Sequence, residues 1–107
     1  MICRLWRGWT TPKNANAYEH VVRDEVIPGI EARNIPGFRH IDLMRRDLGD
    51  EVEFQTLMWF DSLNAIKAFM GEDYAVSHVP AAARAVLKRF DERAAHYEVI
   101  DRREQDR

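Results

Sequence analysis

The sequence predicts one α+β domain in which an antiparallel sheet carries helices on one face only. Segments of bulky residues with two-residue alternation are bounded by turn residues, as in strands. Between them lie stretches with apolar residues at every third or fourth position, as in amphipathic helices. The order is strand, helix, strand, strand, helix, short helix, strand. This is the ferredoxin-like βαββαβ pattern with a four-stranded sheet, and a chain of 107 residues is long enough for one such domain.

The first strand is expected at Ile2–Thr10, and a helix should follow and end near Asn34. Thr11 can cap this helix, with Pro12 at its first position, where the missing N–H costs nothing. Pro28 should kink or briefly break the helix, because proline removes a backbone donor and crowds the preceding turn.

Two strands at Phe38–Asp47 and Glu51–Asp61 should form a hairpin, because Gly49 in the connector can take a positive φ. The second strand has one face without a charge, which should pack under the helices. That face consists of Val52, Phe54, Thr56, Met58 and Phe60. The other face mixes polar residues with Leu57 and Trp59, which helices on one side alone would leave in water. We therefore expect a second copy of the chain to cover Leu57 and Trp59 in a homodimer, a dimeric α/β barrel.

The last third of the chain is expected to hold two helices and a strand. Asp61 or Ser62 should cap the first helix, which Gly71 ends. Pro80 should open the other helix, whose inward residues would be Ala83, Val86, Leu87 and Phe90. The last strand is expected at Ala94–Ile100. Residues 1–107 then form a single domain, whose mixed-sign end at 100–107 should be a frayed tail.

Composition argues against several classes of protein. The net charge is −2 and no basic stripe with interleaved aromatics is present, so nucleic acid is not an expected partner. No apolar stretch could span a bilayer and charges interrupt the N-terminal residues, so neither a membrane nor a signal peptide is expected, and the cytoplasm is the default location. Cys3 is the only cysteine and the histidines lack metal-ligand spacing, so no metal site is expected.

Several short segments share the pattern of one known family. They are Leu5–Trp9 (Leu-Trp-Arg-Gly-Trp), Ile35–Phe38 (Ile-Pro-Gly-Phe), Leu57–Ala65, Phe69–Met70 and Tyr74–His78. Through them the chain resembles the antibiotic biosynthesis monooxygenase family of dimeric α/β barrels, over roughly Ile2–Ile100. The resemblance implies a pocket between the helices and the sheet of each subunit. Several family members oxygenate polycyclic phenols without metal or flavin, through reaction of a deprotonated substrate with O₂. Other relatives isomerise small metabolites.

The resemblance suggests site residues for an enzyme that acts on an aromatic or carbonyl metabolite without a cofactor. His78 could take the substrate proton, or it could simply be a polar residue near the helix at Pro80. Tyr74 could orient a phenol or donate to an oxyanion, or it could be a half-buried packing residue. The pocket would be lined by the aromatic residues Trp6, Tyr18, Phe54 and Phe69.

Two alternatives to this enzyme remain open at this point. A haem-degrading branch of the family uses a histidine early in the third helical region, an asparagine on the first strand and a tryptophan on the second helix. His78 has a matching spacing, but Leu5-Trp6-Arg7 contains no asparagine and Phe69 stands where the tryptophan would be expected. The chain could also be a non-catalytic dimeric binding module, because no acid–base pair stands out in the sequence.

Overall fold

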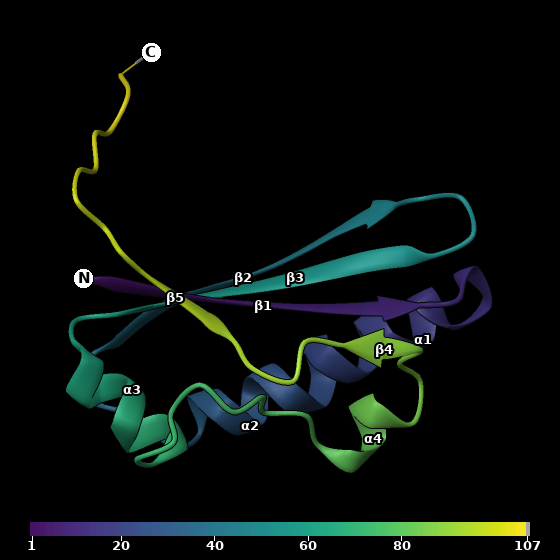
Figure 1. Ribbon diagram of the computed structural model, residues 1–107, viewed down its shortest axis with the longest axis horizontal. Helices are drawn as coiled ribbons and strands as arrows, with labels where there is room; N and C mark the ends of the chain where they lie inside the picture. The colour runs from purple at the N-terminus through teal and green to yellow at the C-terminus, as the bar shows by residue number, and fades with distance from the viewer. Residues whose placement is uncertain (107) are drawn as a thin grey trace.

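All helices of the computed structural model, which describes residues 1–106, lie on one face of a single antiparallel sheet (Figure 1). The strand order is β2-β3-β1-β4, and β5 also pairs with β1. The bounds are β1 (Ile2–Thr10), β2 (Phe38–Asp47), β3 (Val52–Phe60), β4 (Arg89–Phe90) and β5 (Ala95–Glu98). β4 pairs with the end of β1 and β5 with its beginning, so together they occupy the place of a fourth strand. The predicted ferredoxin-like α+β fold is confirmed.

The prediction of a helix from Pro80 to Phe90 is wrong. α4 (Ala81–Arg84) has only four residues, and Phe90 belongs to β4. Apolar residues at helical spacing suggested a longer helix, but the backbone pairs with β1 instead. The Lys88 N–H donates to the Trp9 carbonyl at 2.7 Å, and the Phe90 ring packs 6.1 Å from that of Trp6.

The predicted last strand at Ala94–Ile100 is shorter than expected, because its pairing with β1 extends only over Ala95–Glu98, and a turn at residues 92–94 precedes it. Within this turn the Ala94 N–H donates to the Ala75 carbonyl at 2.7 Å. The Ser77 N–H donates to the Glu92 carbonyl at 3.0 Å. The turn between β4 and β5 therefore holds the 75–77 loop against the sheet.

The first helical region consists of a 3₁₀ turn (Pro12–Asn14), α1 (Ala15–Val21), a π-helical segment η2 (Val22–Val26) and α2 (Ile27–Glu31). Thr11 caps it as predicted, since its hydroxyl accepts from the Asn14 N–H at 3.3 Å. The expected break near Pro28 takes the form of the π-helical segment. There the Ile27 N–H donates to the Val22 carbonyl, five residues back. This wider turn accommodates a proline, which can neither donate nor fit closely against a regular α-turn.

The two faces of β3 differ as the alternation predicted. Val52, Phe54, Met58 and Phe60 are buried under the helices. α3 (Leu63–Met70) packs beside them, capped by the Ser62 hydroxyl and ended by Gly71 at φ 90°. On the helix-free face, Leu57 and Trp59 are half-buried and Glu53 is buried in an ion pair with Arg46 at 2.8 Å.

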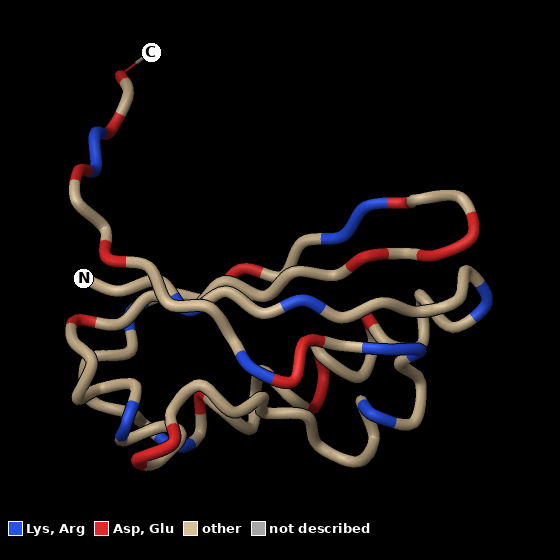
Figure 2. The backbone as a smooth tube through the Cα atoms, in the orientation of Figure 1, with Lys and Arg blue, Asp and Glu red and all other residues tan. Residues whose placement is uncertain are grey.

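The chain continues past β5 on the helix-free side of the sheet and extends away from the domain (Figure 1). Residues 101–106 are exposed and have no regular secondary structure, and residue 107 of the predicted tail lies outside the described residues. Acidic and basic residues are interspersed along the backbone of residues 1–106, with no basic stripe among them (Figure 2). Within residues 1–106, no helix has both the length and the apolar character needed to cross a bilayer.

Candidate functional site

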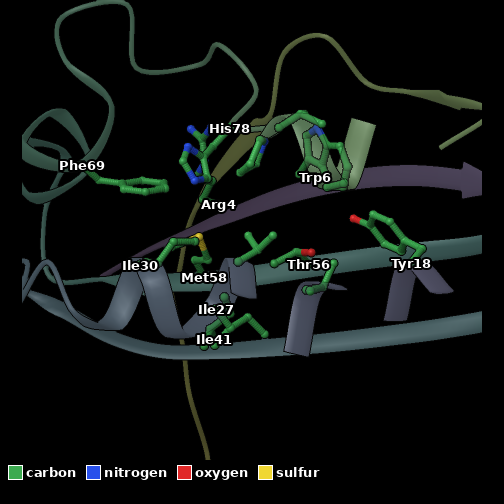
Figure 3. A pocket seen from close by; sticks show the side chains of 15 residues that line it. Arg4, Trp6, Tyr18, Ile27, Ile30, Ile41, Thr56, Met58, Phe69 and His78 are labelled. Atoms are coloured by element: carbon green, nitrogen blue, oxygen red, sulfur yellow. The ribbon is translucent and has the colours of Figure 1, made fainter. Parts of the chain in front are cut away.

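A cavity lies between the helices and the sheet (Figure 3). The space open to the centres of water-sized molecules is about 50 Å³, and all the empty space within the cavity, including solvent at its open mouth, is about 530 Å³. Its wall is mostly apolar and comes from three strands, from the helical region between Tyr18 and Ile30, from Phe69 and from residues 78–83. The polar side chains of the wall are Arg4, Trp6, Tyr18, Thr56 and His78. The cavity therefore suits a small apolar molecule with a few polar groups.

Four of the six site residues suggested by the sequence line this cavity, namely Trp6, Tyr18, Phe69 and His78. Phe54 does not line it. It is on the expected face, but Tyr18 covers it, with the two rings edge to face at 4.7 Å between centroids. Tyr74 does not line the cavity either, because its ring packs against that of His96 at 5.1 Å. A catalytic role for the Tyr74 side chain thus finds no geometric support.

His78 lies at the rim of the cavity. The residue is exposed as a whole, yet its ring contacts that of Phe69 edge to face at 5.3 Å. Partial burial of the ring lowers the pKa of His78 below its ordinary value, because it removes water from the charged form of the imidazole. The positive charges of Arg33 and Arg4 lower this pKa further. Its imidazole is therefore neutral at pH 7, and within residues 1–106 it has no hydrogen-bond partner. It can accept a proton from a molecule in the cavity.

Trp6 forms a fixed wall of the cavity. Its indole N–H lies 2.9 Å from the Ser77 hydroxyl and 2.8 Å from the Asp91 carbonyl. The ring lies over Gly8, where a Cβ would come within 2.8 Å of Trp6 Cη2. Glycine is therefore required beside the indole, and the ring is held in place from both sides.

Tyr18 contributes a neutral hydroxyl to the other end of the cavity. Its oxygen points toward the interior (Figure 3). Burial raises the pKa of Tyr18 well above its ordinary value, so the phenol keeps its proton at neutral pH. This hydroxyl can donate a hydrogen bond to a ligand, but it cannot serve as a base.

Arg4 is the site residue that sequence reasoning missed. The side chain is only 3 % exposed, and it lines the cavity next to Phe69, with its Cζ 5.7 Å from the ring centroid. Nη1 donates to the Tyr74 carbonyl at 2.5 Å and lies 2.9 Å from His96 Nε2, while Nη2 donates to the Val76 carbonyl at 2.8 Å. These partners are all neutral, and desolvation lowers the pKa of Arg4 to about 10. The guanidinium still carries its charge at pH 7.

One signal in the sequence could have revealed Arg4. Two-residue alternation places it on the same face of the first strand as Trp6, which was assigned to the pocket. An arginine at a helix-facing position of a central strand must be buried, and a buried cation needs a partner.

His96 should make folding pH-dependent through its contact with Arg4. Desolvation and the Arg4 charge lower the pKa of His96 to about 4, against about 6.5 in the unfolded chain. Between these values the unfolded state binds a proton that the folded state excludes, so stability falls as pH falls from 6.5 to 4. Because solvent screens this half-buried ring, we expect a contribution of about 1–2 kcal/mol.

Urea unfolding of a His96→Gln variant at pH 6.5 and pH 4.5 would measure this contribution. The variant should lose less stability on acidification than the unmodified protein. His20→Gln is the matched control, because His20 is exposed and bonded only to Asp24 on its own helix. An identical acid dependence in the His96 and His20 variants would contradict the prediction.

The described residues do not provide a cluster of side chains for a metal ion. Within residues 1–106, no three His, Cys, Asp or Glu side chains gather closely enough to hold a metal ion. Haem binding through His78 stays a prediction.

Comparison with known proteins supports the fold. No family model matches the sequence, and no curated protein matches it. Among solved structures, a protein of Bacillus cereus described as a "putative antibiotic biosynthesis monooxygenase" superposes with a TM-score of 0.67 at 13 % identity, covering 97 % of each chain. At that identity the match establishes a shared fold. The chain therefore has the fold of this monooxygenase-like protein, as the resemblance in its sequence implied.

Proposed function

We propose that this chain is an enzyme of the antibiotic biosynthesis monooxygenase type, which oxygenates a small phenol or enolisable carbonyl compound without metal or flavin. One observation carries the proposal: His78 and Arg4 both adjoin Phe69 in the wall of a mostly apolar cavity. A neutral base and a fixed positive charge are what the formation of a substrate anion requires. The shared fold with a monooxygenase-like protein supports the proposal.

The reaction would begin with proton transfer from a substrate carbon or hydroxyl to the His78 imidazole. The positive charge of Arg4, which is desolvated and fixed in position, would favour the resulting enolate or phenolate through its electrostatic field and needs no direct hydrogen bond to it. The electron-rich carbon would then bond to O₂. Cleavage of the O–O bond would convert a CH₂ group to C=O, with one oxygen atom in the product and the other in water.

Oxygen uptake in ¹⁸O₂ tests this proposal. The substrates are an anthrone-type phenol and a smaller, one-ring enolisable ketone. We expect uptake with one labelled oxygen in the product. Filling the cavity by Ala83→Leu should lower the rate at least tenfold, whereas Ala82→Leu, at an exposed position on the same helix, should not. Absence of uptake with every such substrate, in its neutral and in its carboxylate-bearing form, would overturn the proposal.

We also propose that two copies of the chain pack their helix-free faces together in the cytoplasm. Strand pairing places Leu5 opposite Leu57 on that face, and Trp59 lies beside them. Met44 and Tyr97 belong to the same face by register and are 47 % and 57 % exposed. Burying these apolar side chains would stabilise a dimer.

Sedimentation analysis tests the dimer. The unmodified protein should sediment as a dimer. Trp59→Glu should raise the Kd for dissociation of this dimer into monomers at least tenfold. Ala17→Glu is the control, because Ala17 is exposed on the helical side of the domain. An unmodified protein that stays monomeric at high concentration would refute this arrangement.

A further inference from the structure

We infer that the cavity selects organic anions, and that the substrate is a small, one-ring-sized molecule whose carboxylate binds the Arg4 guanidinium. This inference names the substrate class of the enzyme proposed above and rests on that proposal. It is nevertheless tested by binding alone, without turnover.

The first argument is the uncompensated charge of Arg4. Most arginines within residues 1–106 pair with a carboxylate, for example Arg39 with Asp61 at 2.5 Å and Arg46 with Glu53 at 2.8 Å. Arg4 is much more deeply buried than either, yet it bonds only to two carbonyls and to the His96 ring. A buried charge is costly unless an opposite charge compensates it.

A second guanidinium adds to the positive potential at this end of the cavity. Arg33 donates to the Phe69 carbonyl at 2.7 Å, and its Cζ lies 5.0 Å from the Phe69 ring centroid. No described carboxylate forms an ion pair with Arg33 or Arg4. Both charges act on His78 as well, where they lower the pKa of the imidazole. An anion bound here would therefore lie near two guanidinium groups with which no described carboxylate forms an ion pair.

The donors of Arg4 also suit a carboxylate. A guanidinium has five N–H groups, and the contacts within the chain use both of those on Nη1 and one on Nη2. The Nε–H and one Nη2–H remain, and guanidinium groups bind carboxylates through pairs of N–H donors of this kind. The bonds to the Tyr74 and Val76 carbonyls hold the guanidinium rigidly, so little side-chain entropy would be lost on binding.

The rest of the cavity defines the body of the ligand. Met58 and Ile30 supply an apolar wall, and Trp6 limits the space on one side (Figure 3). Val22 also lines the cavity. The empty volume with the mouth is about 530 Å³, enough for one ring that extends from Arg4 toward solvent. His78 at the rim would then lie beside this ring, where it could take a proton from it.

Titration of the protein with benzoate and with benzamide tests this inference. Binding is measured by calorimetry and by the NMR signal of the Trp6 indole N–H. The two probes have the same shape and differ in charge. We expect benzoate to bind at least tenfold more tightly than benzamide and to shift the Trp6 signal. Arg4→Gln should abolish the preference, Arg4→Lys should keep part of it, and Arg39→Gln, which removes an exposed arginine, should leave it unchanged.

The comparison of benzoate with benzamide on the unmodified protein tests the inference even if Arg4→Gln fails to fold. Equal affinity for the two probes, or binding of neither, would overturn the inference. Benzoate binding without oxygen uptake from any carboxylate-bearing phenol or ketone would keep the anion site and reject the monooxygenase. Equal oxygen uptake from an acid substrate and its amide would reject the anion site and keep the enzyme.

Discussion

Replacing Phe60 with alanine should destabilise the domain by about 3–5 kcal/mol, the usual cost of removing a fully buried aromatic ring. Phe60 is 0 % exposed at the end of β3, where its ring lies 5.3 Å from that of Phe38 and 6.1 Å from that of Phe69. Loss of the ring would leave a cavity between the sheet and α3. Because small domains have only about 5–15 kcal/mol of stability, the variant should be close to unfolding at 37 °C.

Urea unfolding of Phe60→Ala checks this prediction. Leu48→Ala is the control, because Leu48 lies in the hairpin connector and is 41 % exposed. It should change the free energy of unfolding by no more than about 0.5 kcal/mol. If Phe60→Ala cost less than about 1 kcal/mol, the burial of this face of β3 would be in doubt.

Replacing His78 with alanine should lower the turnover of the proposed enzyme by about 10²–10⁴-fold, the usual contribution of a general base. The fold should be unaffected, since His78 is exposed and has no hydrogen-bond partner within the described chain. The matched control is His40→Ala, because His40 is also exposed but lies on the helix-free face beside Trp59. Initial rates of oxygen uptake measure both variants, and unchanged turnover in His78→Ala would exclude His78 as the base.

The pH dependence of the rate of oxygen uptake is a second test of His78 as the base. A base acts only when it is unprotonated, and the pKa of His78 is held below its ordinary value by desolvation and by two arginines. The rate should therefore rise with pH through a step below pH 6.5 and stay level above it. Removing one of the positive charges by Arg33→Gln should move this step to higher pH, since the charged imidazole is then less disfavoured.

Local sequence patterns predicted most of the sheet and part of the site. The alternation in β3 identified its buried face, and the positions of Thr11, Ser62 and Gly71 identified helix ends, because these features depend on neighbouring residues only. The helix predicted from Pro80 failed because pairing between Lys88 and Trp9 joins segments far apart in the sequence. No local pattern reports such pairing.

The errors within the site have a similar cause. Alternation shows which face of a sheet a side chain occupies, but it does not show what lies between that side chain and a cavity. Phe54 is on the correct face and is covered by Tyr18. Tyr74 lies in a loop whose conformation no periodicity describes, and it meets Arg4 through its carbonyl oxygen, not its ring. Arg4 itself was detectable from its position next to Trp6 in the alternation.

The most direct test of the claim that this cavity is the ligand site is a crystal structure of the protein grown with benzoate. We expect the carboxylate at about 2.7–2.9 Å from nitrogen atoms of Arg4, as in other guanidinium–carboxylate pairs. The ring should lie against Met58 and Trp6, with His78 beside it. Benzoate found only on the helix-free face or elsewhere on the surface, with the cavity empty, would contradict the claim.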